Sequence, residues 1–114
     1  MDTATFNREA LRMLRLIEKG LVDMCADPLN GMSATLMPRG LTVEIGGKYP
    51  GVYTITLDDT NHQVHMVSPF TGEYLYDYSA DEKAWISTRD QHRIDELMSR
   101  EMVETAYLRG YPNF

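Results

Sequence analysis

Near the start of the chain, apolar residues recur every three or four positions. Over residues 5–26 this spacing predicts an amphipathic helix. Thr3 or Thr5 can cap its start, and Asp27 before Pro28 would end it, because the residue before a proline avoids helical backbone angles. Gly20 within the run costs about 1 kcal/mol relative to alanine, which burial of the apolar stripe would outweigh. That stripe comprises Phe6, Ala10, Leu14, Ile17, Leu21 and Met24.

The middle of the chain changes to a period of two. This alternation predicts six short strands, over residues 33–36, 41–45, 51–57, 63–68, 74–78 and 83–87. The segments between them are short and rich in turn-forming residues. Since a parallel crossover needs a dozen residues or more, these connections favour antiparallel neighbours.

A second helical period begins at Asp90 and continues until Gly110. The order helix, six strands, helix predicts an α+β fold. In this fold two helices cover one face of a single antiparallel sheet, which gives a two-layer sandwich. At 114 residues the chain has the length of one domain, and we expect residues 1–114 to form it.

Composition and charge narrow the functional classes. Hydrophobic residues make up 43% of the chain, yet no apolar run approaches the roughly 20 residues that span a bilayer, so we expect no membrane partner. The net charge of −6 argues against nucleic acid as the main partner, because phosphates need a basic face. The acidity lies in the middle of the chain, where residues 41–84 hold two lysines against seven carboxylates. A single cysteine, Cys25, excludes an internal disulfide framework and any cysteine-only metal site.

Residue types that carry catalytic chemistry are sparse. The sequence has no Ser-His-Asp order, no glycine-rich phosphate loop and no Cys-x-x-Cys pair. His62 and His65 have opposite parity on the predicted strand, so their rings would point to opposite faces and could not share one metal ion. A conventional hydrolase or nucleotide-dependent enzyme therefore has no support.

Two surface features leave alternatives open. The late carboxylates of the first helix could hold iron weakly, or could form a solvated acidic surface. Tyr74, Tyr76 and Tyr78 share one face of a predicted strand, where aromatic side chains either pack across strands or form an exposed patch together with Trp85. Such a patch would be a protein-binding surface.

Several segments, in order, resemble the frataxin family. Leu-Thr-Val-Glu-Ile-Gly-Gly at 41–47 and Val-Tyr-Thr-Ile at 52–55 resemble its second and third strands. Residues 61–72 are similar to the family segment in which Asn-Lys-Gln-Ile-Trp-Leu-Ser-Ser-Pro leads to Ser-Gly. Tyr-Asp-Tyr at 76–78, Trp85, Asp90 and Asp-Glu-Leu-Met at 95–98 continue the match. The resemblance extends from Phe6 to about Tyr107, and its Ser-Pro-x-x-Gly stretch is of the eukaryotic type.

The resemblance implies the same helix–sheet–helix sandwich and a monomeric protein, located in the mitochondrial matrix if the chain is eukaryotic and in the cytoplasm if it is bacterial. It further implies that the protein binds iron and assists iron–sulfur cluster assembly by docking on the cysteine desulfurase–scaffold complex. Ferroxidase activity has been ascribed to some members, but it needs clustered carboxylates or histidines, which this sequence does not show. The alternative is a small α+β protein-interaction domain without metal binding.

The resemblance places iron binding on an acidic ridge along the first helix. Here Arg12, Arg15 and Lys19 stand where frataxins commonly carry acids, and because cations repel a metal ion we expect iron binding to be weak. The candidate ligands are Asp23, which falls on an acidic family position, and by proximity Asp27, Glu18 and Glu9.

The resemblance also implies a docking surface on the sheet. His65 stands where the family has an exposed tryptophan, and Leu75 stands where an arginine is usual. Histidine keeps part of the flat contact and adds a charge that depends on protonation. The candidate partner-binding residues are Asn61, Gln63, His65, Ser68, Pro69 and Trp85.

Overall fold

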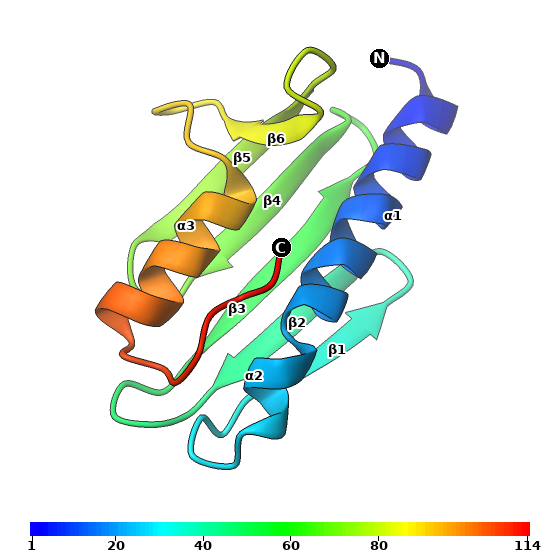
Figure 1. The fold of residues 1–114 in the computed structure, drawn as a ribbon. Helices are drawn as coiled ribbons and strands as arrows, with labels where there is room; N and C mark the ends of the chain where they lie inside the picture. The colour runs from blue at the N-terminus through cyan, green and yellow to red at the C-terminus, as the bar shows by residue number, and fades with distance from the viewer.

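The computed structural model describes all residues from 1 to 114 and has two layers (Figure 1). Six strands form one sheet in the order β1-β2-β3-β4-β5-β6, and every neighbouring pair is antiparallel. The helices lie on one face of this sheet, so the predicted α+β sandwich is confirmed. The elements are α1 (Thr3–Gly20), α2 (Val22–Ala26), β1 (Ser33–Met37), β2 (Gly40–Ile45), β3 (Gly51–Asp58), β4 (Gln63–Ser68), β5 (Gly72–Ser79), β6 (Ala84–Ser87), α3 (Ile94–Arg100) and the π-helix η1 (Glu101–Thr105).

The core lies between the sheet and the helices. Alternate residues of the strands point toward the helices and are buried, as the period of two predicts; Leu41, Val43 and Ile55, for example, have no or almost no exposed surface. From α1 the predicted apolar stripe meets them, with Phe6 and Leu14 fully buried. Their burial supplies the main driving force for joining the two layers. None of the helices combines the length and the apolar character required to cross a membrane.

The first helix departs from the prediction in two ways. It is interrupted at Leu21, so that residues 3–26 form α1 and the short α2 rather than one continuous helix. Its cap is Asp2, whose carboxylate accepts a hydrogen bond of 2.7 Å from the Thr5 amide, and not Thr3 or Thr5. The aspartate accepts this bond because it occupies the extended position just before the first helical turn.

Gly20 has a packing role that its position in the sequence does not reveal. The C-terminal tail runs between α3 and α1 (Figure 1), and the Asn113 amide donates a 2.8 Å hydrogen bond to the Gly20 carbonyl. A Cβ atom at position 20 would lie 2.5 Å from Cδ1 of Phe114. The absent side chain therefore lets the tail lie directly against the helix.

Asn30 anchors the other end of the tail. Its buried side chain donates to the carbonyl oxygens of Met24 at 3.0 Å and Arg109 at 2.9 Å, and its Oδ1 accepts from the Arg109 amide at 2.7 Å. These three bonds satisfy the whole amide group and link α2 to the segment that follows η1. They therefore fix where the tail enters the helical layer.

Candidate functional site

The sheet face opposite the helices is uncovered. In its centre Thr56, His65 and Leu75 lie side by side on β3, β4 and β5. Leu75 keeps 41% of its surface exposed and Val52, on the same face of β3, keeps 45%. A flat antiparallel surface that mixes exposed apolar and polar side chains is suited to contact with another macromolecule. We call it the open face.

Polar pairs connect neighbouring strands across this face. Gln63 donates a 3.0 Å hydrogen bond from Nε2 to Oδ1 of Asp77. His65 Nε2 lies 3.8 Å from Oε2 of Glu73, so protonation of the imidazole would create an ion pair there. Two of the predicted partner-binding residues, Gln63 and His65, are thus on the open face and are preorganised by carboxylates of β5.

Asn61 and Pro69 lie at the two ends of β4. Asn61 shapes the β3–β4 turn, in which its side chain donates to Oδ2 of Asp58 at 2.9 Å and its amide donates to Oδ1. These hydrogen bonds hold the pKa of Asp58 below its ordinary value. Pro69 is exposed and packs against Gly51, where a Cβ atom would lie 2.5 Å from the proline Cβ. Asn61 therefore borders the open face beside Asp58, whereas Pro69 packs on Gly51, which has the parity of the buried Tyr53.

Ser68 does not lie on the open face, which corrects the prediction. It follows Met66 by two positions on β4, points to the helices and is only 4% exposed. Its hydroxyl donates a 2.6 Å hydrogen bond to Glu101 and accepts from the amides of Phe70 and Thr71. This serine stabilises the β4–β5 turn from inside the protein.

The prediction also places Trp85 on the wrong face of the sheet. It is opposite Tyr78 in the β5–β6 ladder, on the helix-covered face, and is only 3% exposed. Its indole packs edge-on against Phe6 of α1, with 5.8 Å between the ring centroids. A large aromatic at this strand position fills the space between β6 and α1, so its role is in the core.

The tyrosines of β5 share one face, as predicted, but that face is covered by helices. Tyr76 is fully buried, while Tyr74 and Tyr78 are half-buried. The hydroxyl of Tyr76 lies 2.6 Å from Nε2 of His92, and burial raises the pKa of this tyrosine. The packing interpretation is therefore confirmed, and the exposed aromatic patch with Trp85 is wrong.

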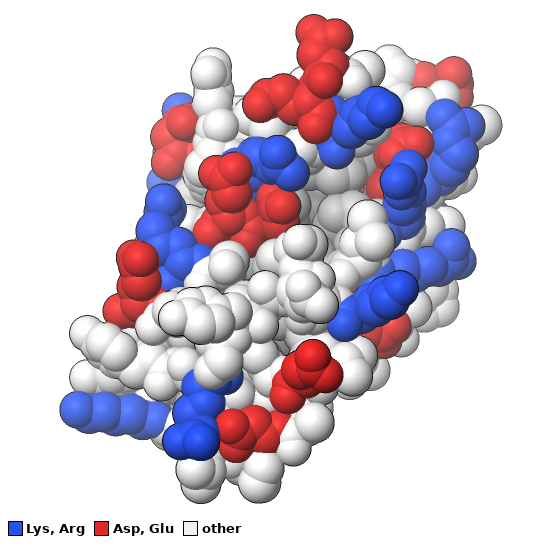
Figure 2. All heavy atoms as spheres, viewed as in Figure 1, with Lys and Arg blue, Asp and Glu red and all other residues white.

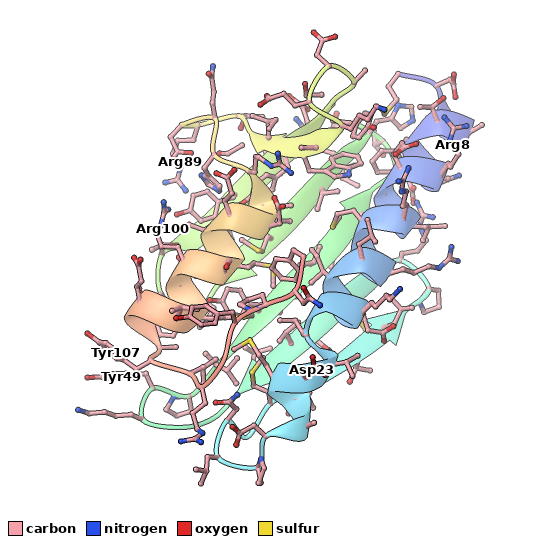
Figure 3. All side chains as sticks on the ribbon, in the orientation of Figure 1. Arg8, Asp23, Tyr49, Arg89, Arg100 and Tyr107 are labelled. Atoms are coloured by element: carbon pink, nitrogen blue, oxygen red, sulfur yellow. The ribbon has the colours of Figure 1, made fainter.

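The four candidate iron ligands do not come together. Asp23 is exposed on α2 (Figure 3). Asp27 instead accepts a 2.9 Å hydrogen bond from Arg109 and another from the Leu29 amide, and these two bonds lower the pKa of Asp27. Glu9 of α1 pairs with Arg8 at 3.3 Å. Glu18 is half-buried beside Lys19.

Nowhere in the molecule do three or more His, Cys, Asp or Glu side chains come close enough to hold a metal ion. High affinity for iron would need several oxygen or nitrogen ligands around one position. The candidate residues therefore do not fit a preformed iron centre.

Comparison with known proteins decides the family. The sequence profile of the family described as "Frataxin-like domain" matches residues 1–107, which is most of the chain. The chain belongs to the frataxin family. This confirms the resemblance found in the sequence.

Curated frataxins are similar over about half of the chain. The chain is 36% identical over 61 residues to "Frataxin homolog, mitochondrial" of Schizosaccharomyces pombe, over 54% of this chain and 37% of that protein. It is 31% identical over 62 residues to "Frataxin, mitochondrial" of Arabidopsis thaliana, over 54% of this chain and 32% of that protein. The matched segments thus span about a third of the length of these relatives.

Solved frataxins share the fold. The frataxin of Psychromonas ingrahamii superposes with a TM-score of 0.76 at 19% identity, covering 95% of this chain and 94% of that one. The trimeric frataxin of Saccharomyces cerevisiae, complexed with ferrous iron, superposes with a TM-score of 0.73 at 21% identity, covering 87% and 86%.

One residue of this frataxin-family chain was missed by the sequence reasoning. Glu101 is 3% exposed, and its carboxylate accepts hydrogen bonds from the hydroxyls of Tyr53 at 3.0 Å, Ser68 at 2.6 Å and Thr71 at 2.6 Å. A signal was present, because Glu101 follows Leu97 by four positions and so continues the apolar stripe of the last helix. Three hydroxyl donors compensate for burying the carboxylate without a cation.

Proposed function

We propose that this protein assists iron–sulfur cluster assembly by docking through its open face on the cysteine desulfurase–scaffold complex of the mitochondrial matrix. Frataxin family membership supports an iron-related function. The observation that carries the proposal is the uncovered sheet face with His65 and Leu75 at its centre. The mitochondrial relatives support the compartment, and we expect the protein to act as a monomer.

The chemistry of the open face supports a protein partner. Its centre combines the exposed side chain of Leu75 with the flat imidazole of His65, and acidic residues such as Glu73 and Asp77 border them. Apolar and flat side chains supply contact area, and the carboxylates attract a basic counterpart. A partner with a basic rim around an apolar centre fits this face.

A binding assay with a reconstituted desulfurase–scaffold complex tests the docking. His65→Ala and Leu75→Ala should each raise the dissociation constant about tenfold, as expected for central interface residues. Leu29→Ala is the matched control, because Leu29 is also an exposed leucine, at 66%, but lies in the loop after α2. Unchanged binding by both open-face variants would refute docking through this surface.

Iron, in this proposal, is cargo held weakly by exposed carboxylates, with Asp23 as the principal ligand. Anaerobic calorimetric titration with Fe(II) should show weak binding that is reduced in Asp23→Asn and retained in Asp81→Asn, which removes an exposed carboxylate of the β5–β6 turn. Identical affinity of both variants and the wild type would remove Asp23 from the site. Absence of iron binding together with absence of desulfurase binding would select the alternative, a small interaction domain without metal.

A further inference from the structure

A groove on the helical layer is not used by the proposed function. It has a volume of about 570 Å³ and lies between α1, the start of β6, the start of α3 and the tail residues Asn113 and Phe114. Along α1 it extends from Glu9 to Gly20, about 16 Å at the rise of an α-helix. This volume is typical of pockets for small molecules. We call it the helix groove.

The floor of the helix groove is apolar. Half of its lining residues are hydrophobic, among them Ile17, Trp85 and Ile94 from the core. Leu16 and Phe114, at its border, leave 53% and 43% of their surfaces exposed. Exposed apolar side chains gathered around a hollow are a feature of surfaces that receive a ligand.

The rim of the helix groove carries free positive charge. Arg12, Lys19 and Lys83 line it, and none of them takes part in an ion pair. Its two carboxylates are already paired: Glu9 with Arg8 at 3.3 Å, and Asp95 with Arg93 at 3.3 Å. In a protein of net charge −6 this hollow is therefore a local positive site.

The distribution of charge over this side of the molecule agrees with that description. In Figure 2, Lys and Arg side chains gather along α1, beside an uncharged surface that lies between α1 and α3. The cations would meet the polar end of a bound molecule, while the uncharged surface would meet its apolar body.

We propose that the helix groove binds an amphipathic monocarboxylate, a fatty acid in chemical class. Its chain would lie against the exposed apolar side chains of Leu16 and Phe114, over the core residues at the bottom of the groove, where it is partly removed from water. Its carboxylate would receive charge-assisted hydrogen bonds from Arg12 and Lys83 at the rim. The unpaired cations favour an anion, the apolar floor favours a hydrocarbon body, and the volume favours a small molecule over a folded partner.

Trp85 provides a local signal for testing this proposal, because it is the only tryptophan of the chain and it lines the groove. The probe is dodecanoate, used below its micelle concentration and compared with dodecyltrimethylammonium, which has the same chain and the opposite charge. We expect saturable quenching or enhancement of Trp85 fluorescence by dodecanoate. We expect no saturable change with the cationic amphiphile.

Two variants locate the site. Arg12→Gln and Lys83→Gln should each weaken dodecanoate binding about tenfold, since each removes a charge-assisted contact. Arg15→Gln is the matched control, because Arg15 is exposed on the same helix, is also unpaired and does not line the groove. The affinity of this variant for dodecanoate should stay within about twofold of the wild type.

Three results would overturn the proposal. The first is the absence of saturable binding by dodecanoate, and the second is equal affinity for the two amphiphiles. The third is an equal loss of affinity in Arg15→Gln and Arg12→Gln, which would indicate unspecific attraction to the basic side of α1. Far-UV circular dichroism of each variant checks that the fold is retained, since all three substitutions are of surface residues.

Discussion

Ser68→Ala tests whether this serine acts in the interior or at the partner surface. The substitution removes one hydroxyl that donates to the buried Glu101 carboxylate at 2.6 Å. The same oxygen accepts hydrogen bonds from the Phe70 amide at 3.0 Å and from the Thr71 amide at 3.2 Å. Alanine therefore leaves an under-satisfied buried charge and two amides without acceptors in the β4–β5 turn.

The expected loss follows from these three bonds. A hydrogen bond to a charged group contributes about 1.5–3 kcal/mol to stability, and the two amide bonds of the turn add a smaller amount. We expect the free energy of unfolding to fall by about 2–4 kcal/mol. For a domain of this size, each kcal/mol lowers the melting temperature by about 4 °C, so the decrease should be about 8–16 °C.

Thermal unfolding followed by circular dichroism measures this decrease. Ser33→Ala is the control, because Ser33 is exposed on β1 and makes only a 3.4 Å contact with Glu44; its melting temperature should change by no more than about 2 °C. Below its melting temperature, Ser68→Ala should bind the desulfurase–scaffold complex as the wild type does. A melting temperature equal to that of Ser33→Ala, or a specific loss of partner binding in the folded variant, would refute the interior role.

Two further predictions concern the tail and the buried tyrosines. Gly20→Ala should lower the melting temperature, although alanine favours a helix by about 1 kcal/mol, because its Cβ would lie 2.5 Å from the Phe114 ring and 3.0 Å from the Asn113 carbonyl oxygen and so displace the tail backbone; an increase would contradict this packing. Burial raises the pKa of Tyr53 and Tyr76 in the folded protein. Below the ordinary tyrosine pKa of 10.0, these two groups should therefore leave the free energy of unfolding unchanged. Above pH 10.0, the free energy of unfolding should fall as the pH rises. Urea unfolding at about pH 8 and about pH 11, with phenolate absorbance as a second signal, measures this effect; ionisation of all tyrosines before unfolding would contradict it.

The candidate site was predictable where it depends on strand parity. His65 and Gln63 are odd-numbered positions of β4, and the alternation places them together on the face away from the helices. The same rule assigns Ser68 to the covered face with Met66, so the interior position of this serine is also encoded in the strand pattern. Trp85 was misassigned for another reason: the face that a short edge strand presents depends on its register with β5.

The candidate iron ligands show a second limit of prediction from the sequence. Asp23 falls on an acidic position of the family pattern, and Asp27 joins it as a candidate only because it is near in the sequence. In the fold Asp27 pairs with Arg109, which is 82 positions away, and a contact of that range leaves no periodic signal in the chain. Glu101 is similar, since its three hydroxyl partners come from β3, the end of β4 and the turn after it.

The sequence by itself determined the elements and their layers. Periods of 3.6 and 2 residues depend only on local backbone geometry, so they specified two helical regions, six strands and the buried face of most of them. Only the tertiary structure decided the hydrogen bonds of Glu101, the close approach of the tail to Gly20 and the positive rim of the helix groove. Each of these depends on which distant side chains are brought together when the layers pack, and local periodicity carries no information about those pairings.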